Sequence, residues 1–359
     1  MSSTRERRVY YITIKEIAKI AGVSTATVSY VINNSKNVAA EKRQRVMEAI
    51  TQSGFQPNQV AKSLRVKKTN NIGVLVEDIT SFPAPAIING ISEYVEQSGY
   101  HILLNDLRML ESLFNRYDQI TQQKDKVNEA MSLLIFGAKV DAVIYVGMFD
   151  RDITGIINDI QKPLIIAYST SSDPHACSVT YDNEDVSEEA ARYLLNAGHS
   201  RIAVITGLAH TSPARMRMKG INKAFREAGL ILDNALVKNG DWEYASGYSC
   251  MAELLEQERE TPPTALFAMN DLMAVGAMNA IREAGLHVPG DISVIGFDNR
   301  EISSLMLPKL TTVEIDLKKI GFEAAKMAVH KIMGNDEYSG KRSFIVTSRL
   351  ILRDTVLKL

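Results

Sequence analysis

Four side chains in the second half of the chain have the chemistry needed to hold a small polar molecule. Arg217 lies downstream of the apolar run RIAVITG, three residues before Gly220, and Trp242 lies in NGDWEYASGY. Asn270 follows the run ALFAM, and Asp298 follows SVIGF. A bidentate cation, an aromatic plate, an amide and a carboxylate gathered in one cleft would bind a polyhydroxylated or anionic ligand.

These residues need a scaffold that brings strand ends together, and the sequence beyond Asn71 predicts one. Short apolar runs typical of buried parallel strands alternate there with helical stretches that close at glycine. The runs are IGVLV, HILL, DAVIYVG, PLIIAY, RIAVITG, ALFAM, SVIGF and TTVEI. The alternation predicts two doubly wound α/β subdomains, in which a ligand binds beyond the carboxyl ends of the strands.

Three residues in the first of these subdomains are further candidates for the same cleft. Tyr168 ends the run PLIIAY, and Asp78 and Phe82 follow the first run, IGVLV. We expect Asp78 and Phe82 to close the cleft from the first subdomain, although the segment SFPAPAI is also compatible with a simple helix start.

The amino-terminal sequence ITIKEIAKIAGVSTATVSYVIN predicts two short helices joined by a tight turn. Ile14, Ile17, Ala18 and Ala21 recur at helical spacing, so the first helix has an apolar face with a small residue at its middle. Gly22 permits the left-handed backbone conformation that such a turn requires. The small residue allows the second helix to cross closely.

Ser24 is a suitable N-cap for this second helix, in which Val28, Val31 and Ile32 are expected to point inward. A third helix is expected over about 40–53. This layout predicts a helix-turn-helix, whose second helix enters the major groove of DNA by its N-terminal residues. The exposed positions of that helix are Thr25, Ala26, Thr27, Ser29 and Tyr30. The direct base readers are expected to be Thr25, Ala26 and Tyr30.

Charge is distributed unevenly along the chain. The whole protein has a formal net charge of -1, but residues 1–70 hold 13 Lys and Arg against 4 Asp and Glu. The remaining residues hold 28 basic and 38 acidic side chains. A basic run is also compatible with a solvated face, but next to a helix-turn-helix it favours a module that binds a polyanion.

The segment TIKEIAKIAGVSTATVSYVINNSKNVAAEKRQRVMEAITQSGFQPNQVAKSLRVKKTNNIGVLV resembles the amino-terminal region of the LacI/GalR family of bacterial transcription regulators. The motifs W-x-x-x-S-G-Y, R-x-x-G, M-N-D-x-M-A-x-G-A and I-G-F-D-N are similar to the effector cleft of that family. The resemblance implies a DNA-binding headpiece, a hinge helix that folds on DNA, and a core like periplasmic sugar-binding proteins. It also implies that Arg217, Trp242, Asn270 and Asp298 contact the effector.

The segment after the third helix has its own expected role. NQVAKSLRVKKTNN offers barely two helical turns, and a helix this short is marginal in water, so it should order only when DNA binds it. In similar regulators the leucine of the S-L motif wedges into the minor groove, which implies this role for Leu64. Lys62 and Arg65, together with Arg45, are expected to contact phosphates. The full set expected at the DNA is Thr13, Ser24, Thr25, Ala26, Thr27, Ser29, Tyr30, Asn33, Lys62, Leu64 and Arg65.

The expected organisation has four parts along the chain. They are an N-terminal tail (1–11), a helix-turn-helix domain (12–57), a hinge helix and linker (58–71), and an effector-binding and dimerisation core (72–359). In the core, the first subdomain is expected to comprise about 72–174 and 308–338, and the second about 175–307 and 339–359.

Composition argues against several other classes of protein. No apolar run approaches the ~18 residues of a membrane span, and no signal-type segment follows MSSTRERRVYY, so we expect a cytoplasmic protein without membrane contact. Cys177 and Cys250 share no metal-ligand spacing with histidine, which argues against a disulfide framework and a zinc site. Neither a metal nor a cofactor is expected.

Two rival functions are an enzyme on the same scaffold and a sugar-binding module without a regulatory role. The chain lacks a Walker sequence, a G-x-S-x-G elbow, a G-x-G-x-x-G turn and an H-E-x-x-H pair, and the basic headpiece counts against a transport module. We therefore expect a non-enzymatic repressor that binds a near-palindromic operator as a homodimer. Its effector, a sugar or related metabolite, could be an inducer or a corepressor, and a protein corepressor stays open. No heptad tail for a tetramer follows the strand-like run SFIVTSRLIL.

Overall fold

The computed structural model describes residues 12–32, 38–55, 68–113, 119–335, 340 and 342–359. The chain divides into two compact units, Met1–Thr69 and Asn70–Leu359. Within the described ranges, no helix is both long enough and apolar enough to cross a membrane.

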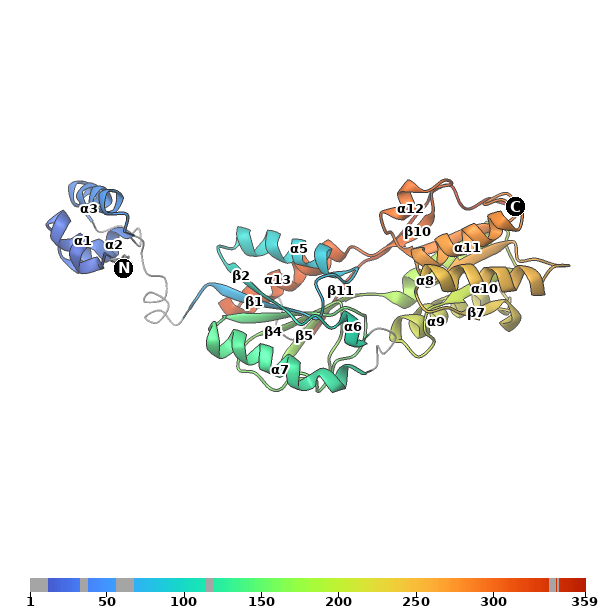
Figure 1. Cartoon of the computed structure of the whole chain (residues 1–359), viewed down its shortest axis with the longest axis horizontal. Helices are drawn as coiled ribbons and strands as arrows, with labels where there is room; N and C mark the ends of the chain where they lie inside the picture. The colour runs from blue at the N-terminus through green and yellow to red at the C-terminus, as the bar shows by residue number, and fades with distance from the viewer. Residues whose placement is uncertain (1–11, 33–37, 56–67, 114–118, 336–339, 341) are drawn as a thin grey trace, which may run out of the picture. The chain divides into compact units, whose positions relative to one another are not determined.

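The amino-terminal unit contains the three predicted helices, α1 (Ile14–Ala21), α2 (Thr25–Ile32) and α3 (Ala40–Ser53) (Figure 1). Gly22 ends α1 with a φ of 62°, and its N–H donates to the carbonyls of Ala18 and Lys19. Ser24 caps α2, because its Oγ accepts the Thr27 N–H at 3.2 Å. These local contacts confirm the predicted helix-turn-helix.

A small apolar cluster holds the three helices together. Its members include Ile17, Ala18 and Ala21 of α1, Val28 and Val31 of α2, and Val46 and Ala49 of α3. The predicted apolar face of α1 is therefore correct except at Ile14, which is 39% exposed. Ile14 opens the helix, whereas the packing is centred on the following turns.

The first sheet of the large unit has the strand order β11-β5-β4-β3-β1-β2, with every neighbouring pair parallel. Its strands are β1 (Asn71–Val76), β2 (His101–Asp106), β3 (Ala142–Val146), β4 (Leu164–Ala167), β5 (Ala176–Tyr181) and β11 (Ser343–Val346). Successive residues such as Val74 and Leu75 belong to different apolar clusters, because both faces of the sheet are covered. The helices α5 (Ala84–Gln97) and α13 (Leu317–Met333) cover one face, and α7 (Lys124–Ser132) the other (Figure 1).

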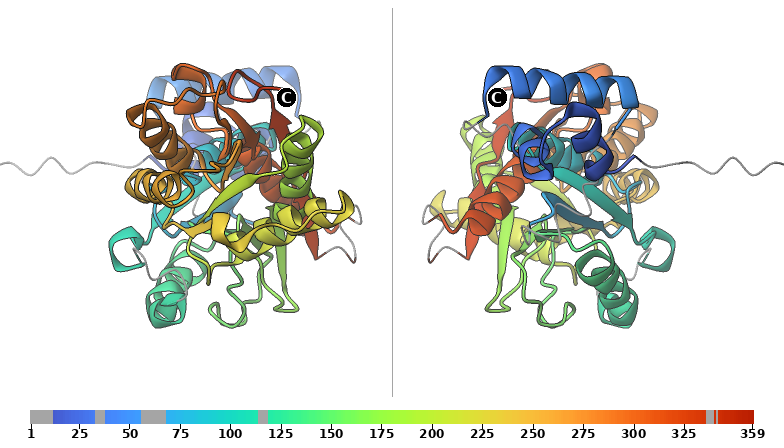
Figure 2. Two further views of the ribbon diagram at one scale, coloured as in Figure 1. Left: turned by 90° about the vertical axis from the view of Figure 1, so that its right-hand side faces the viewer. Right: turned by 90° about the vertical axis from the view of Figure 1, so that its left-hand side faces the viewer.

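The second sheet has the order β12-β10-β9-β8-β6-β7, and its only antiparallel neighbours among the described strands are β10 and β12. Its strands are β6 (Ile202–Thr206), β7 (Val237–Asn239), β8 (Ala265–Ala268), β9 (Ser293–Asp298), β10 (Thr311–Glu314) and β12 (Arg349–Ile351). Helices α8 (Asn183–Asn196) and α9 (Ser212–Glu227) lie on one side, and α10 (Tyr244–Gln257) and α11 (Asp271–Glu283) on the other (Figure 2). The short elements are α6 (Leu110–Leu113), α12 (Ile302–Leu305), η1 (Gln119–Gln123), η2 (Leu133–Gly137) and η3 (Asn234–Leu236).

The two doubly wound subdomains were predicted correctly, but their limits need a correction. β5 and β11 pair in the first sheet, whereas 175–307 and 339–359 were assigned to the second subdomain. β10 pairs in the second sheet, although 308–338 was assigned to the first. The chain thus crosses between subdomains after β5, after β10 and after β11. β5 escaped detection because Ser178 and Thr180 interrupt its apolar run, although every residue of the strand is buried.

Candidate ligand-binding cavity and DNA-recognition helix

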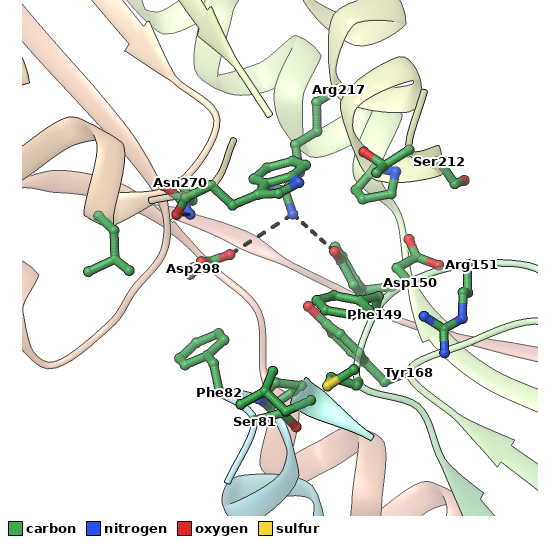
Figure 3. A pocket seen from close by; sticks show the side chains of 18 of the residues that line it. Ser81, Phe82, Phe149, Asp150, Arg151, Tyr168, Ser212, Arg217, Asn270 and Asp298 are labelled. Atoms are coloured by element: carbon green, nitrogen blue, oxygen red, sulfur yellow. Dashed lines mark hydrogen bonds and ion pairs between the residues drawn. The ribbon is translucent and has the colours of Figure 1, made fainter. Parts of the chain in front are cut away.

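A cavity of about 650 Å³ lies between the two subdomains, beyond the carboxyl ends of strands from both sheets. Figure 3 shows side chains of the first subdomain facing those of the second across it. The predicted residues that line it are Phe82, Tyr168, Arg217, Trp242, Asn270 and Asp298. The structure therefore brings together six of the seven candidates that the sequence pointed to.

Arg217 is the central cation of this cavity and is only 3% exposed. Its Nε donates to Asn183 Oδ1 at 2.8 Å, its Nη2 donates to the Tyr181 hydroxyl at 3.0 Å, and its Nη1 donates to the Met269 carbonyl. The guanidinium carbon lies 3.5 Å from the ring centroid of Phe297. These partners fix the side chain and use three of its five N–H groups, which leaves two for a ligand.

Asp298 stands beside Arg217 at the end of β9. Its Oδ1 lies 3.9 Å from Arg217 Nη2, and its Oδ2 lies 3.4 Å from Arg300 Nε. Burial raises the pKa of Asp298, although the two nearby cations oppose the rise. Its φ of 111° is seldom adopted by residues other than glycine, so the backbone holds this carboxylate in a strained conformation of the kind found at binding sites.

Trp242 forms a flat wall next to the same arginine. Its ring centroid lies 5.5 Å from the Arg217 guanidinium carbon, and its carbonyl accepts from Asn270 Nδ2 at 2.7 Å. Asn270 Oδ1 accepts the Met273 N–H at 2.8 Å and so caps α11, which leaves one amide hydrogen for a ligand. Gly207 is required behind the indole, because a Cβ there would lie 2.0 Å from a ring atom.

The first subdomain contributes an aromatic wall. The rings of Tyr168 and Tyr181 stack with centroids 5.6 Å apart. Burial raises the pKa of Tyr168 well above its usual value and that of Tyr181 to about 12, so both hydroxyls keep their protons as donors at neutral pH. Phe82 reaches across to the second subdomain, since the Arg300 guanidinium carbon lies 4.0 Å from its ring centroid.

Asp150 is a charged cavity residue that the sequence analysis did not single out. It lies four residues after β3, and its Oδ2 accepts from Asn183 Nδ2 at 2.5 Å. Burial raises the pKa of Asp150 to about 6, while Arg217 and the Asn183 hydrogen bond oppose the rise. The signal was present, because Asp150 follows the strand-like run DAVIYVG as the other candidates follow theirs. Tyr181 was missed for a different reason, because it ends the undetected strand β5.

Asp78 does not line the cavity, contrary to expectation. Its Oδ1 accepts the Thr80 N–H at 2.9 Å and the Thr80 hydroxyl at 2.5 Å, and its Oδ2 accepts the Leu110 N–H at 2.9 Å. The carboxylate therefore holds the turn after β1 against the start of α6. A short acidic side chain just after a strand often bonds to the backbone of its own turn, and that local role prevails here.

Metal ligation finds no support in the described part of the chain. No group of three or more His, Cys, Asp or Glu residues there could hold an ion. Cys177 and Cys250 are both buried free thiols.

The start of α2 presents short side chains to solvent, as the helix-turn-helix prediction requires. Thr25, Ala26 and Tyr30 are exposed, with Tyr30 at 53%, whereas Thr27 and Ser29 are partly buried.

The structure describes only some of the other candidate DNA-binding residues. Thr13 forms a capping box with Glu16 at the start of α1, and Ser24 shares a 2.9 Å hydrogen bond with Thr27. Lys19 and Lys42 line a shallow hollow beside Ser24 and Thr27. Asn33, Lys62, Leu64 and Arg65 lie outside the described residues.

Comparison with known protein families gives two matches. Residues 13–58 match the family described as bacterial regulatory proteins, lacI family. Residues 191–356 match the periplasmic binding protein-like domain.

Curated relatives resemble the chain over nearly its whole length. The chain is 34% identical over 351 residues to the HTH-type transcriptional repressor PurR of Pasteurella multocida. This alignment covers 96% of the present chain and 98% of the relative. It is 32% identical over 318 residues to the catabolite control protein A of Priestia megaterium, covering 88% and 91%.

Solved structures show the same architecture. The Lac repressor dimer bound to operator and the anti-inducer ONPF superposes with a TM-score of 0.76 and 26% identity, over 97% of this chain and all of that chain. A complex of the transcriptional regulator CelR with cellobiose has a TM-score of 0.64 and 26% identity, over 96% and 99%.

Proposed function

Because the chain belongs to the lacI family of bacterial regulatory proteins, and is thus a DNA-binding transcription regulator of the repressor type, we propose that it binds a near-palindromic operator as a homodimer under the control of a neutral sugar. The observation that carries the ligand part is the cavity between the subdomains, whose lining combines aromatic walls with four carboxylates and four guanidinium groups. A binding role without catalysis accords with charged groups that already pair with one another.

The charge balance of the cavity favours a neutral polyhydroxylated ligand over an anionic one. Arg217 and Arg300 both lie near Asp298, and the whole lining holds four carboxylates and four guanidinium groups, so an added phosphate or carboxylate would meet as many like charges as cations. Sugar hydroxyls can donate to the carboxylates and accept from the arginines at once. The Trp242 ring offers an apolar plate for the C–H face of a pyranose.

Some of the solved structures support a carbohydrate ligand without deciding which one. CelR was solved as a cellobiose complex, and the Lac repressor with the ligands ONPF and ONPG. The stacked tyrosines are also compatible with a planar nucleobase, which makes nucleobases the competing class in any ligand screen.

The dimer part of the proposal has a surface feature in its favour. Ile302, Leu305 and Leu307 are all exposed within one short stretch around α12, with Leu307 at 86%. Clustered exposed apolar side chains of this kind mark protein contacts. The relative with a TM-score of 0.76 is a dimer on its operator.

The DNA part rests on the helix-turn-helix and the basic amino-terminal segment. In the proposal, Thr25, Ala26 and Tyr30 read bases and Lys42 contacts a phosphate. The minor-groove wedge of Leu64 and the phosphate contacts of Lys62 and Arg65 belong to the same proposal, on residues outside those described. Sugar and operator then influence each other reciprocally, by a coupling of about 1–3 kcal/mol, or roughly 5- to 150-fold in affinity. Either sign is compatible with this scheme.

Trp242 provides a direct test of the ligand proposal, because it is the single tryptophan of the chain and lines the cavity. D-glucose, D-galactose, D-ribose, cellobiose and lactose would each be titrated while the fluorescence is recorded. A saturable change with one sugar, and a 5- to 150-fold shift in operator affinity at saturation, are expected. If only hypoxanthine, guanine or adenine changed the signal, the sugar proposal would be wrong and the regulator assignment would stand.

Tyr30→Ala tests the DNA proposal on an exposed side chain that makes little contribution to the fold. Affinity for a genomic fragment selected by the wild-type protein should fall by roughly 5- to 150-fold, as for the loss of a base contact, while binding to random DNA changes little. The measurement is fluorescence anisotropy with both DNAs. Lys42→Ala is the matched contrast, because a lost phosphate contact should weaken both DNAs alike and lower the salt slope by about 1. Equal losses of specific and random binding in Tyr30→Ala would exclude base reading.

A further inference from the structure

Asn183 connects the two walls of the cavity without lining it. It is the first residue of α8, directly after the chain crosses from the first subdomain to the second, and it is buried. Its Nδ2 donates to Asp150 of the first subdomain at 2.5 Å, and its Oδ1 accepts from Arg217 of the second at 2.8 Å. The amide orientation is determined by chemistry, because a carboxylate needs a donor and a guanidinium needs an acceptor.

On the second-subdomain side, Asn183 is fixed relative to Arg217. Its helix, α8, packs closely on α9, and a Cβ at Gly220 of α9 would lie 2.1 Å from the Glu184 carbonyl oxygen. The two helices therefore touch through their backbones, one residue from Asn183 and three from Arg217. Relative motion of the two subdomains would leave the Asn183–Arg217 bond in place.

On the first-subdomain side, Asp150 is fixed just as firmly by buried Glu77. The Glu77 Oε2 accepts from the Met148 N–H at 2.9 Å and from Arg151 Nη2 at 2.6 Å, and the Tyr145 hydroxyl donates to Oε1. Met148 and Arg151 are the residues on either side of Phe149 and Asp150. One carboxylate oxygen thus clamps both ends of the short loop that presents Asp150.

We propose that Asn183 is the positioning residue that aligns Asp150 with Arg217, so that the two ligand-binding groups come into register only when the subdomains adopt the arrangement seen here. Both sides of the Asn183–Asp150 bond are rigid, so this bond must break or form when the subdomains rotate. The inference rests on the proposed effector site. It adds a residue that reaches no ligand and still sets ligand affinity.

The titratable and charged groups that face Asp150 are Arg217 on α9, Tyr168 after β4 and Tyr181 at the end of β5. Both tyrosines stay neutral at ordinary pH, so Arg217 is the charged neighbour that matters. In the wild-type protein, sugar affinity should fall as the pH drops through about 6, because a protonated Asp150 is a weaker acceptor for sugar hydroxyls than the charged carboxylate.

Asn183→Asp is the decisive variant because it removes the donor to Asp150 and keeps the acceptor for Arg217. The new carboxylate still accepts from Arg217, but it faces the Asp150 carboxylate with no proton between them. Affinity for the best sugar in the panel of five should fall by roughly 10- to 150-fold at pH 7.5. It should rise again below about pH 7, where a proton shared by the two carboxylates restores the bond, opposite to the wild-type trend.

The matched background is Asp150→Asn, in which the carboxylate introduced at position 183 can accept from the amide introduced at position 150. In this background Asn183→Asp should cause no further loss beyond about twofold, because an acceptor and a donor face each other again. A loss that is the same at every pH and in both backgrounds would assign Asn183 to folding alone and overturn the inference. Unchanged sugar affinity in Asn183→Asp would overturn it as well.

A ligand-free measurement separates this inference from the proposed function. The pKa of Asp150 can be followed by 13C NMR of labelled aspartate carboxyls, with Asp150→Asn identifying the signal. Asn183→Asp should raise this pKa by at least about one unit, because it replaces a donor with a second carboxylate. An unchanged value would refute the inference even if no sugar in the panel bound, whereas a shifted value without sugar binding would refute only the proposed ligand.

Discussion

Asp298→Asn is expected to weaken sugar binding by roughly 10- to 150-fold and to remove the operator response at sugar concentrations that saturate the wild-type protein. A hydrogen bond to a charged group contributes about 1.5–3 kcal/mol, and the amide replaces one acceptor oxygen with a donor. Arg217 keeps its bonds to Asn183, Tyr181 and Met269, so the cavity should persist. Trp242 fluorescence measures the sugar affinity, and a gel shift measures the response.

Asp291→Asn is the matched control for this charge change. Asp291 belongs to the same subdomain, but it is exposed and bonds to the His287 N–H at 2.7 Å, away from the cavity. Its variant should bind sugar like the wild-type protein, and both variants should bind operator normally without sugar. A full sugar response in Asp298→Asn would remove Asp298 from the site, and parallel losses in both variants would trace the effect to net charge.

The sequence could predict most of this cavity because its fold class gathers strand ends. Asn270 and Asp298 each follow a recognisable apolar run, and parallel sheets carry such positions to one edge. Phe82 and Tyr168 were predicted by the same rule from the other sheet. The rule concerns position alone, and so it also selected Asp78, whose carboxylate bonds to the backbone of its own turn.

The site residues that the sequence did not predict depend on contacts that no local sequence pattern contains. Tyr181 and Asn183 flank a crossing whose strand, β5, carries polar residues in buried positions, so its periodicity is weak. The partnership of Asn183 with Asp150 and Arg217 joins residues 33 and 34 positions apart in sequence. One of the three incorrect subdomain limits lies at the same place, because it was set before β5. Long-range pairing decides both features, and a single sequence does not display it.

The amino-terminal unit was the most predictable part, since its signals are local. A left-handed glycine, a serine cap and apolar residues at helical spacing specify neighbouring turns. The unit is also sensitive to substitutions in its small apolar cluster. Few apolar side chains hold it together, and a domain of this size buries a small share of its surface and is only marginally stable.

Ala18→Asp should therefore weaken operator binding by more than about 100-fold. Ala18 is 6% exposed and belongs to an apolar cluster, where a carboxylate either remains charged at high cost or takes up a proton. The folded fraction of the unit falls, and apparent DNA affinity falls in proportion to the competent fraction. Circular dichroism should show lost helix, while Trp242 still reports normal sugar binding, because it belongs to the other compact unit.

Ile20→Asp is the control that isolates burial from charge. Ile20 lies two residues further along α1 but is 57% exposed, so its variant changes the net charge of the same helix equally and leaves the apolar cluster intact. Added negative charge near DNA weakens binding in both variants, but the loss in Ile20→Asp should stay within about tenfold and vanish at raised salt. The excess loss in Ala18→Asp should persist there. Equal losses at every salt concentration would mean that electrostatics, and not the close crossing of α1 and α2, governs operator binding.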